Sequence, residues 1–150
     1  MMPADAKPAL LSAEQRHFLN TQRVARFASS DEHGQPHVVP VCYCVLEASA
    51  YFSIDQKPKR AQVQRLKRLR NIEQNPKVAL VIDHYDEDWS QLGWVMLRGQ
   101  ALLLNDGDEH ALAQPALRER YPQYRSMHLS ALPVVAIRIE RVAAWGTLRC

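Results

Sequence analysis

The chain has 150 residues, of which 47% are hydrophobic, and a formal net charge of +3 at neutral pH. This length is typical of one domain with a hydrophobic core, and no apolar run approaches the ~20 residues of a membrane-spanning helix. Seven of the 19 basic residues fall between positions 57 and 70, a stretch without acidic residues, so the remainder of the chain is net acidic. Such localised charge argues against a general nucleic-acid binder.

The N-terminus and the cysteines bear on the location of the protein. Residues 1–10 lack the basic region and apolar stretch of a signal peptide, so we expect one cytoplasmic domain, residues 1–150, without a membrane partner. The three cysteines are odd in number, which does not suggest a disulfide framework. Cys42 and Cys44 have no further ligands at a metal-binding spacing, so we interpret them as core or interface thiols.

The first predicted elements are a polar leader with a short helix, within about residues 1–20, and then a β-hairpin. Ser12 suits the N-cap position of the helix, and Phe18 supplies an apolar anchor. Residues 23–29 form the first arm of the hairpin. Gly34 can adopt the positive φ that a turn after this arm requires.

The second arm, residues 37–46, is mostly β-branched and aromatic, but Pro40 removes one backbone donor in its middle. Pro40 therefore marks an edge strand, a bulge, or a place where the backbone of Val39 and Val41 is free to meet a ligand. A third strand follows at residues 50–55.

The basic stretch after this strand changes from strand to helix periodicity. One apolar residue recurs at every third position, at Val63, Leu66, Leu69 and Ile72. This spacing predicts an amphipathic helix of about four turns that ends before Pro76. Three cations lie at or before its first turn, namely Lys57, Lys59 and Arg60. Positive side chains at a helix N-terminus oppose the positive end of the helix dipole, which is unfavourable. A phosphate bound between these side chains and the free backbone amides would remove this repulsion.

The remaining pattern predicts three more strands, at residues 77–85, 94–104 and 133–146, and a helix within residues 105–124 that Pro115 breaks or restarts. Three strands, a helix, two strands, a helix and a strand do not make the alternation of a parallel α/β fold. This order predicts a mainly β protein with peripheral helices, in which six antiparallel strands form a barrel and the helices cover its openings.

The motifs of nucleotide-binding folds, hydrolases and zinc proteases are absent from the sequence. Five glycines are too few for a phosphate-cradling loop, so side-chain cations and a helix terminus must hold any bound phosphate. His84 stands beside several acids, where a solvated acidic turn is a better interpretation than a metal site. Trp94, beyond this turn, suits either packing or stacking on a planar cofactor.

Three segments resemble the pyridoxamine phosphate oxidase-like split-barrel flavoproteins, and more narrowly the branch that uses the deazaflavin coenzyme F-420: PHVVPV (36–41), DQKPKR (55–60) and LRNIEQNPKVAL (69–80). The resemblance extends over roughly residues 20–145. It implies a six-stranded antiparallel split β-barrel that forms a homodimer, with two cofactors bound in clefts between the subunits.

The same resemblance implies a cofactor site for coenzyme F-420 or FMN. The phosphate shell would consist of Ser53, Lys57, Lys59 and Arg60. The backbone around Pro40 and Val41 would line the edge of the ring, and Trp94 would approach from the other subunit.

The implied chemistry is hydride transfer between the cofactor ring and an electron-poor small molecule, so no catalytic side chain and no metal are assigned. Vitamin B6 oxidation is not expected, because the second strand lacks the arginine and lysine that pyridoxamine phosphate oxidases carry there. Two alternatives stay open: an FMN-binding relative without that oxidase activity, and a non-enzymatic flavin or haem carrier. Nucleic acid is not expected as a partner.

Overall fold

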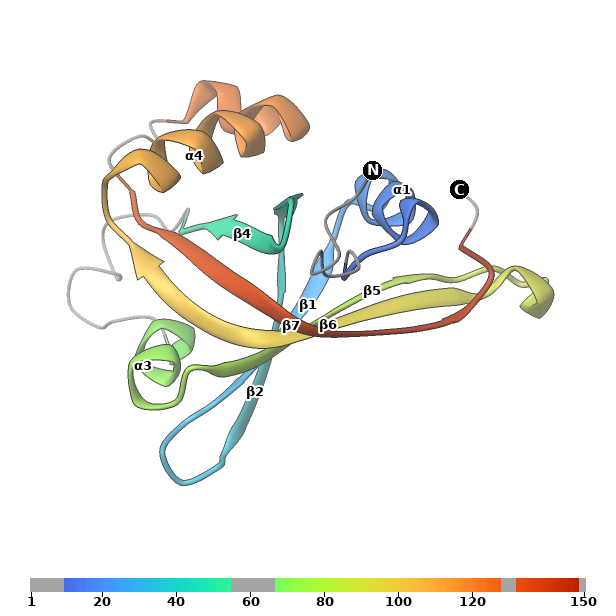
Figure 1. Cartoon of the computed structure of the whole chain (residues 1–150), viewed down its shortest axis with the longest axis horizontal. Coiled ribbons are helices and arrows are strands. Elements are labelled where there is room, and N and C mark those ends of the chain that lie inside the picture. Colours follow the sequence, from blue (N-terminus) through green and yellow to red (C-terminus); the bar gives the residue numbers. More distant parts are fainter. Residues whose placement is uncertain (1–9, 55–66, 128–131, 149–150) are drawn as a thin grey trace, which may run out of the picture.

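The structure is a computed structural model that describes residues 10–54, 67–127 and 132–148. Within these ranges, seven antiparallel strands form one sheet in the order β2-β1-β5-β6-β7-β4-β3. The strands are β1 (Ala25–Ser30), β2 (Pro36–Val41), β3 (Tyr43–Leu46), β4 (Ser49–Ser53), β5 (Lys77–His84), β6 (Gly93–Leu104) and β7 (Val134–Gly146). The long strands β6 and β7 run side by side, and the sheet curls strongly about them (Figure 1).

The curled sheet is a split β-barrel whose two edge strands are consecutive in the chain. β2 pairs with β1 at one edge, β3 pairs with β4 at the other, and only Cys42 lies between β2 and β3. The mainly β, antiparallel barrel predicted from the sequence is confirmed. The expected number of six strands is wrong by one, because the single strand predicted at residues 37–46 changes its pairing partner in the middle.

Helix α1 (Ala13–Thr21) forms as the sequence predicts. Ser12 Oγ accepts the N–H of Gln15 at 3.0 Å, and Gln15 Oε1 accepts the N–H of Ser12 at 2.9 Å. This reciprocal capping box satisfies two backbone donors that a helix start would otherwise leave open. Phe18 and Leu19 on the same helix are fully buried in the core.

Helix α3 (Lys67–Gln74) is the described part of the predicted basic helix. It ends directly before Asn75 and Pro76, where the sequence predicts its end. Ile72 is buried and Leu69 packs against the core, as the apolar spacing indicates. The predicted first half of this helix lies outside the described residues.

Helix α4 (Asp108–Arg120) runs through Pro115, so the prediction of a break there is wrong. The proline removes one backbone donor from the helix, which costs roughly 3 kcal/mol in a helix interior. Burial of Ala113 and Leu117 against the sheet offsets this cost. Leu112, on the opposite side of the helix from these residues, is 68% exposed.

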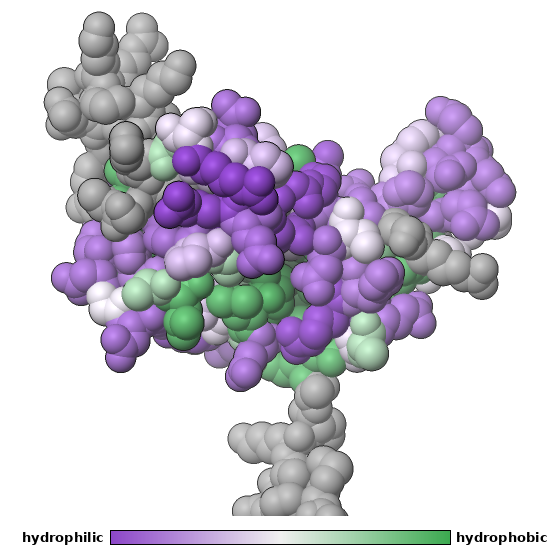
Figure 2. All heavy atoms as spheres, turned by 90° about the horizontal axis from the view of Figure 1, so that it is seen from above, coloured by the Kyte–Doolittle hydropathy of each residue, from purple (hydrophilic) through white to green (hydrophobic). Residues whose placement is uncertain are grey.

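Two 3₁₀ helices complete the described elements, η1 (Trp89–Gln91) and η2 (Pro122–Ser126). No helix in the described ranges is long and apolar enough to cross a membrane. The side of the molecule that carries α1 and α4 is largely hydrophilic, with one apolar area among the polar side chains (Figure 2).

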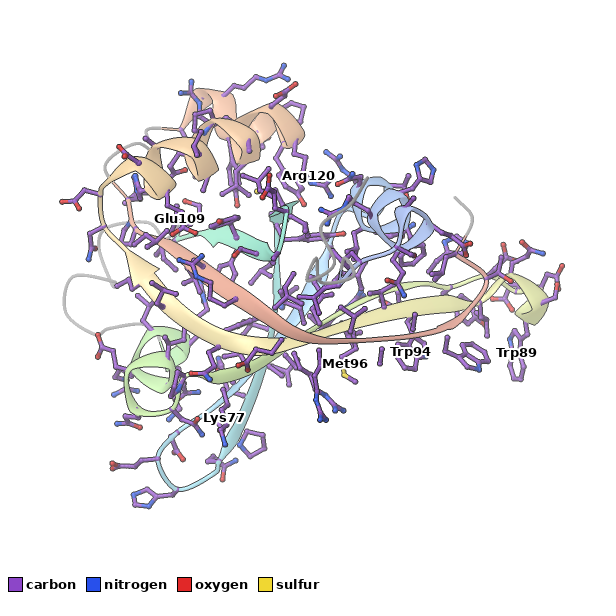
Figure 3. All side chains as sticks on the ribbon, in the orientation of Figure 1. Lys77, Trp89, Trp94, Met96, Glu109 and Arg120 are labelled. Carbon is purple, nitrogen blue, oxygen red and sulfur yellow. The ribbon has the colours of Figure 1, made fainter. Side chains whose placement is uncertain are left out.

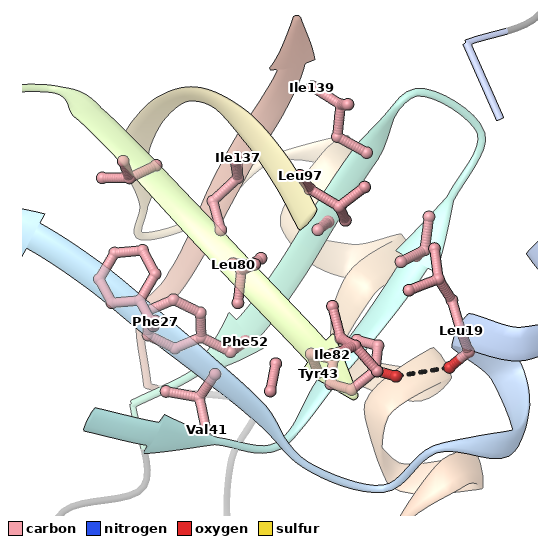
Figure 4. Packing of buried hydrophobic residues seen from close by; sticks show 14 of the residues in the cluster. Leu19, Phe27, Val41, Tyr43, Phe52, Leu80, Ile82, Leu97, Ile137 and Ile139 are labelled. Carbon is pink, nitrogen blue, oxygen red and sulfur yellow. Dashed lines mark hydrogen bonds between the residues drawn. The ribbon is translucent and has the colours of Figure 1, made fainter. Parts of the chain in front are cut away.

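The core fills the interior of the barrel and holds the ends of the sheet together. Phe27 of β1 and Phe52 of β4 contact each other with ring centroids 4.8 Å apart, although their strands are not neighbours in the sheet. Tyr43 spans the core, and its hydroxyl donates to the carbonyl oxygen of Leu19 at 2.6 Å (Figure 4). Burial raises the pKa of Tyr43 well above its ordinary value, so this hydroxyl stays protonated and remains a donor.

A second apolar cluster lies between α4 and the strands β3, β4 and β7. Its buried members are Cys44, Tyr51, Ala113, Leu117, Tyr121, Tyr124, Val134 and Ala136. Cys44 is therefore a core thiol, as predicted, and burial raises its pKa to about 12. A thiol with this pKa is not a reactive nucleophile at neutral pH.

A polar contact fastens the start of α4 to the sheet beside this cluster. Glu109 accepts two hydrogen bonds from the Arg138 guanidinium of β7, one of them at 2.7 Å, and one at 2.6 Å from the Tyr51 hydroxyl. The Arg138 hydrogen bonds, with a smaller contribution from Tyr51, lower the pKa of Glu109 to about 2. Because the folded-state pKa lies below the unfolded value, this contact stabilises the fold fully above about pH 5 and loses its effect as the pH falls towards 2.

Replacing Glu109 by glutamine should lower the free energy of unfolding by about 1 kcal/mol at pH 7, since both charged side chains are partly exposed. The difference from wild type should shrink between pH 5 and pH 3. Urea unfolding at several pH values measures it, with Glu119→Gln on the exposed side of α4 as the control. A difference that stays constant from pH 7 to pH 3 would contradict the assigned role of the carboxylate.

Candidate functional site

The outer face of the curled sheet is only partly covered. Helix α4 packs over β3, β4 and the first half of β7. On the other strands, the outward side chains are exposed or half-buried within the described part of the chain. Figure 3 shows Lys77, Trp94 and Met96 on the side of the sheet opposite to Glu109 and Arg120. We call this uncovered surface of β1, β2, β5, β6 and the end of β7 the open face.

Strand register arranges the open face in rows that cross the sheet. One row consists of directly paired residues from five strands, Pro40, Arg26, Val81, Met96 and Ala143. The next row on one side is Val38, Ala28, Ala79, Arg98 and Arg141, and on the other side it is Asp83, Trp94 and Trp145. Residues two apart in a strand share a face, so these rows belong to one surface.

Two of the predicted site residues lie on this open face. Pro40 is exposed and pairs with Arg26, on a strand at the edge of the sheet, which is the position where a proline is tolerated. Trp94 lies in the neighbouring row, half-buried between Asp83 and Trp145. The register therefore brings the two residues to the same surface although 54 positions of sequence separate them.

The other predicted residues do not join them on the open face. Val41 points inward and is buried in the core. Ser53 is buried under α4, with its hydroxyl 3.4 Å from Gln114 Nε2. Ser53 also stands close to the end of the described segment, directly before the basic stretch. Lys57, Lys59 and Arg60 lie outside the described residues.

Two hollows open on the open face because three of its side chains are alanines. One hollow, of about 280 Å³, is lined by Ala28, Ser29, Ser30, Lys77, Val78, Ala79 and Arg98. The other, of about 360 Å³, is lined by Arg98, Arg141, Val142 and Ala143. Arg98 lines both hollows. Their described lining contains three cations and no acid, which favours an anionic ligand.

Sequence reasoning did not single out Lys77, Arg98 and Arg141. They lie on three different strands, and only the pairing of β5, β6 and β7 brings them to one surface. The available signal was the alternation of β6, in which Arg98 stands at an outward position between buried neighbours.

Acidic residues near the η1 turn do not make a metal centre in the described ranges, where no three His, Cys, Asp or Glu side chains are grouped to hold an ion. His84 Nε2 lies 3.9 Å from Asp86 Oδ2 in a partly exposed pair. Asp83 is paired with Arg26 at 2.6 Å.

The sequence assigns this split β-barrel to a known family. The profile of the pyridoxamine 5'-phosphate oxidase family matches residues 11–146. The chain belongs to this family.

Three individual proteins of known name are similar to this chain. Over 130 residues the chain is 28% identical to the 5a,11a-dehydrotetracycline/5a,11a-dehydrooxytetracycline reductase of Streptomyces rimosus, covering 86% of this chain and 78% of that protein. A solved FAD-binding protein of Mesorhizobium loti is 27% identical, with a TM-score of 0.64 and coverage of 89% of this chain and 94% of the other. The haem storage protein HutZ of Vibrio cholerae is 16% identical, with a TM-score of 0.69 and coverage of 91% and 94%, which shows a common fold.

Proposed function

We propose that the protein is an oxidoreductase that uses a bound flavin-type cofactor, coenzyme F-420 or FMN, to transfer hydride to or from an electron-poor small molecule. The observation that carries this proposal is the likeness to the Streptomyces rimosus reductase over 86% of the chain, within a family whose profile covers residues 11–146. The similarity to a solved FAD-binding protein at 27% identity supports the flavin-type cofactor.

The residues of the open face fit a planar, anionic cofactor. One row is apolar except for Arg26, and Trp145 stands in the row beside it, which suits contact with a ring system. Cations border this row, which suits phosphate groups. Backbone groups around Pro40 and Val41, on an edge strand, would line the ring, and Trp94 would be supplied by a second subunit.

The phosphate of the cofactor would be held by Lys57, Lys59 and Arg60, with Ser53 at the entry to that segment. When bound, the cofactor supplies the hydride chemistry. The protein's own side chains would orient the ring and exclude water from the cleft, so the proposal assigns no catalytic acid, base or nucleophile. The second strand offers only His37, Val39, Pro40 and Cys42 and no arginine or lysine, so B6 oxidation is not part of the proposal.

A spectroscopic titration tests this function. Purified protein is mixed with F-420, FMN and haem in turn, and the reduced form of any bound flavin-type cofactor is then mixed with a conjugated enone. We expect a saturable shift of the cofactor absorbance with F-420 or FMN, followed by oxidation of the reduced cofactor when the enone is added. Binding of haem alone, or binding of a cofactor without any turnover across a panel of acceptors, would instead indicate a carrier.

We further propose a homodimer in which the open face contacts a second subunit. Exposed apolar side chains support it, since Val38 is 60% exposed and Trp145 is 54% exposed on this surface. Sedimentation at micromolar concentration should give a dimer.

Val38→Lys combined with Trp145→Lys should weaken the dimer at least tenfold, because charges would then enter the interface. Leu112→Lys, at an equally exposed site on α4, should not change it. A wild-type monomer, or equal weakening by both sets, would rule out this surface as the subunit contact.

A further inference from the structure

Strands β6 and β7 contain a one-residue β-bulge. Gly99 lies opposite Ile139, but the next residue of β6, Arg98, lies opposite Arg141. Glu140 is therefore the extra residue of the bulge. If the strands paired in a regular register past Gly99 and Ile139, Arg98 would lie opposite Glu140, a favourable pair of opposite charges. The bulge places two arginines opposite each other instead.

Both strands fix this bulge. A Cβ on Gly99 would lie 1.8 Å from the carbonyl oxygen of Arg138, so only glycine allows the strands to approach this closely. Beyond the bulge, Val142 turns inward and packs against the core. In a regular register without the bulge, Arg141 would pair with the inward Leu97 and face the core, and Val142 would face solvent. The hydrophobic pattern of β7 thus requires the bulge. It does not require an arginine at position 141, where an acid would have formed an ion pair with Arg98.

The two guanidinium groups have no compensating partner among the residues that the structure describes. The acids on the strands of the open face are Glu140 and Asp83. Glu140 accepts a hydrogen bond from Gln100 at 3.4 Å, and Asp83 pairs with Arg26. Like charges directly opposite each other on neighbouring strands destabilise a sheet. An anion between the two arginines would remove this cost.

Next to the two arginines there is space for such an anion, and there are further hydrogen-bond donors. Arg98 lines both hollows of the open face, Arg141 lines the larger one, and Lys77 lines the smaller one. Ser30 lines the smaller hollow as well, and its Oγ accepts a hydrogen bond from Asn75 Nδ2 at 2.9 Å. The Ser30 hydroxyl proton therefore remains available to a ligand.

We propose that Arg98 and Arg141, with Lys77 beside them, form a binding site for a multiply charged oxyanion on the open face. Its recognition chemistry is that of phosphate or carboxylate groups, whose paired oxygens match guanidinium groups. The site is separate from the cations at positions 57–60 that the cofactor proposal uses. The anion is either part of the proposed cofactor or a separate small molecule, and the proposal does not depend on which cofactor binds.

Calorimetric titration with pyrophosphate and with citrate, at constant ionic strength, tests the site. The wild-type protein should bind one anion per chain in a saturable manner, and Arg98→Gln combined with Arg141→Gln should weaken binding at least tenfold. Arg118→Gln, which removes an exposed arginine of α4, is the control and should bind like wild type. No saturable binding by wild type, or equal weakening in the control, would overturn the proposal.

The same variants identify the source of the anion. If the double variant also binds F-420 or FMN more weakly, the anionic group belongs to the cofactor. If cofactor binding is unchanged while pyrophosphate binding is lost, a separate small molecule occupies the site. The arginines could instead pair with acids of a second chain, such as Asp86 and Asp88 near the η1 turn. In that case Asp86→Asn with Asp88→Asn would weaken the dimer as strongly as the arginine double variant does, and pyrophosphate would have no effect. This outcome would contradict the proposal.

Thermal unfolding gives an independent measurement. Arg141→Glu restores a pair of opposite charges across the bulge, so this variant should unfold about 2 °C higher than wild type in low-salt buffer without multivalent anions. Excess pyrophosphate should stabilise wild type and reverse the order. A variant that is less stable than wild type under both conditions would show that the two arginines do not repel each other in the fold.

Discussion

Replacing Arg120 by alanine should lower the free energy of unfolding by about 3 kcal/mol, because three structural elements lose a shared donor. The guanidinium of this residue, at the end of α4, donates to the carbonyl oxygens of Tyr43 and Asn20 at 2.8 Å each, and to that of Gln22. The Asn20 and Gln22 carbonyls lie at the end of α1, where helical carbonyls have no partner within the helix. Arg120 therefore connects α4, α1 and β3 in one contact.

Ring contacts add to this effect. The Arg120 guanidinium carbon lies 4.9 Å from the ring centroid of Tyr43 and 5.3 Å from that of Tyr121. Such cation–π contacts are worth about 0.5–1 kcal/mol each in a partly exposed setting. Lysine at this position keeps the charge but lacks the planar fork of donors, so Arg120→Lys should recover less than half of the lost stability.

Urea unfolding monitored by far-UV and near-UV circular dichroism measures these changes. Arg118→Ala, two residues earlier and exposed on the same helix, is the matched control and should stay within about 0.5 kcal/mol of wild type. An Arg120→Ala variant that loses less than about 1 kcal/mol would mean that water replaces the guanidinium at the carbonyl oxygens without cost.

Simultaneous replacement of Lys57, Lys59 and Arg60 by alanine should abolish binding of both FMN and F-420, the largest functional effect that we expect. These cations stand together at or before the predicted helix start, where side chains and free backbone amides can converge on one phosphate. Each charge-assisted contact is worth roughly 1.5–3 kcal/mol. The loss of three therefore amounts to about 4.5–9 kcal/mol, comparable to the ~8 kcal/mol that hold a micromolar complex together. Titration of the variant with each cofactor measures the effect.

The later cations of the same stretch form the control set, namely Arg65, Lys67, Arg68 and Arg70. On the predicted helix, steps of 100° send Arg65, Lys67 and Arg70 to different sides, so the four cations cannot all point at one phosphate. Lys67 already has a partner, Asp31, at 3.6 Å. Alanine at these four positions should leave FMN affinity within about threefold of wild type, since exposed ion pairs are worth under ~1 kcal/mol. Equal losses from the two sets would show one undivided basic patch.

Local sequence features predicted those elements whose causes lie within a few residues. Ser12 begins α1 because its side chain reaches the backbone three positions later, and α3 ends before Pro76 because proline disfavours helix at the preceding residue. Strands β5, β6 and β7 follow runs of apolar residues that strand periodicity explains. The barrel class followed from their order, and the family from three short motifs.

The errors have causes outside the local sequence. Pro115 breaks no helix, because burial of Ala113 and Leu117 of α4 against the sheet outweighs the lost hydrogen bond. One predicted strand becomes β2 and β3, because its two halves pair with strands at opposite edges of the sheet. Neither the sheet that packs against α4 nor the strands that pair with β2 and β3 can be identified from the residues near Pro115 or near residues 37–46.

The sequence by itself determined that the protein is a mainly β domain with helices at predictable ends, since strand and helix periodicity reflect backbone geometry and nearby side chains. Only the tertiary structure decided which residues form the open face. Register across distant strands places Pro40 and Trp94 on one surface and turns Val41 into the core, and a single extra residue in β7 sets Arg141 opposite Arg98. Because a shift of one residue exchanges the two faces of a strand, the pairing of distant strands decides which side chains meet, and local patterns cannot.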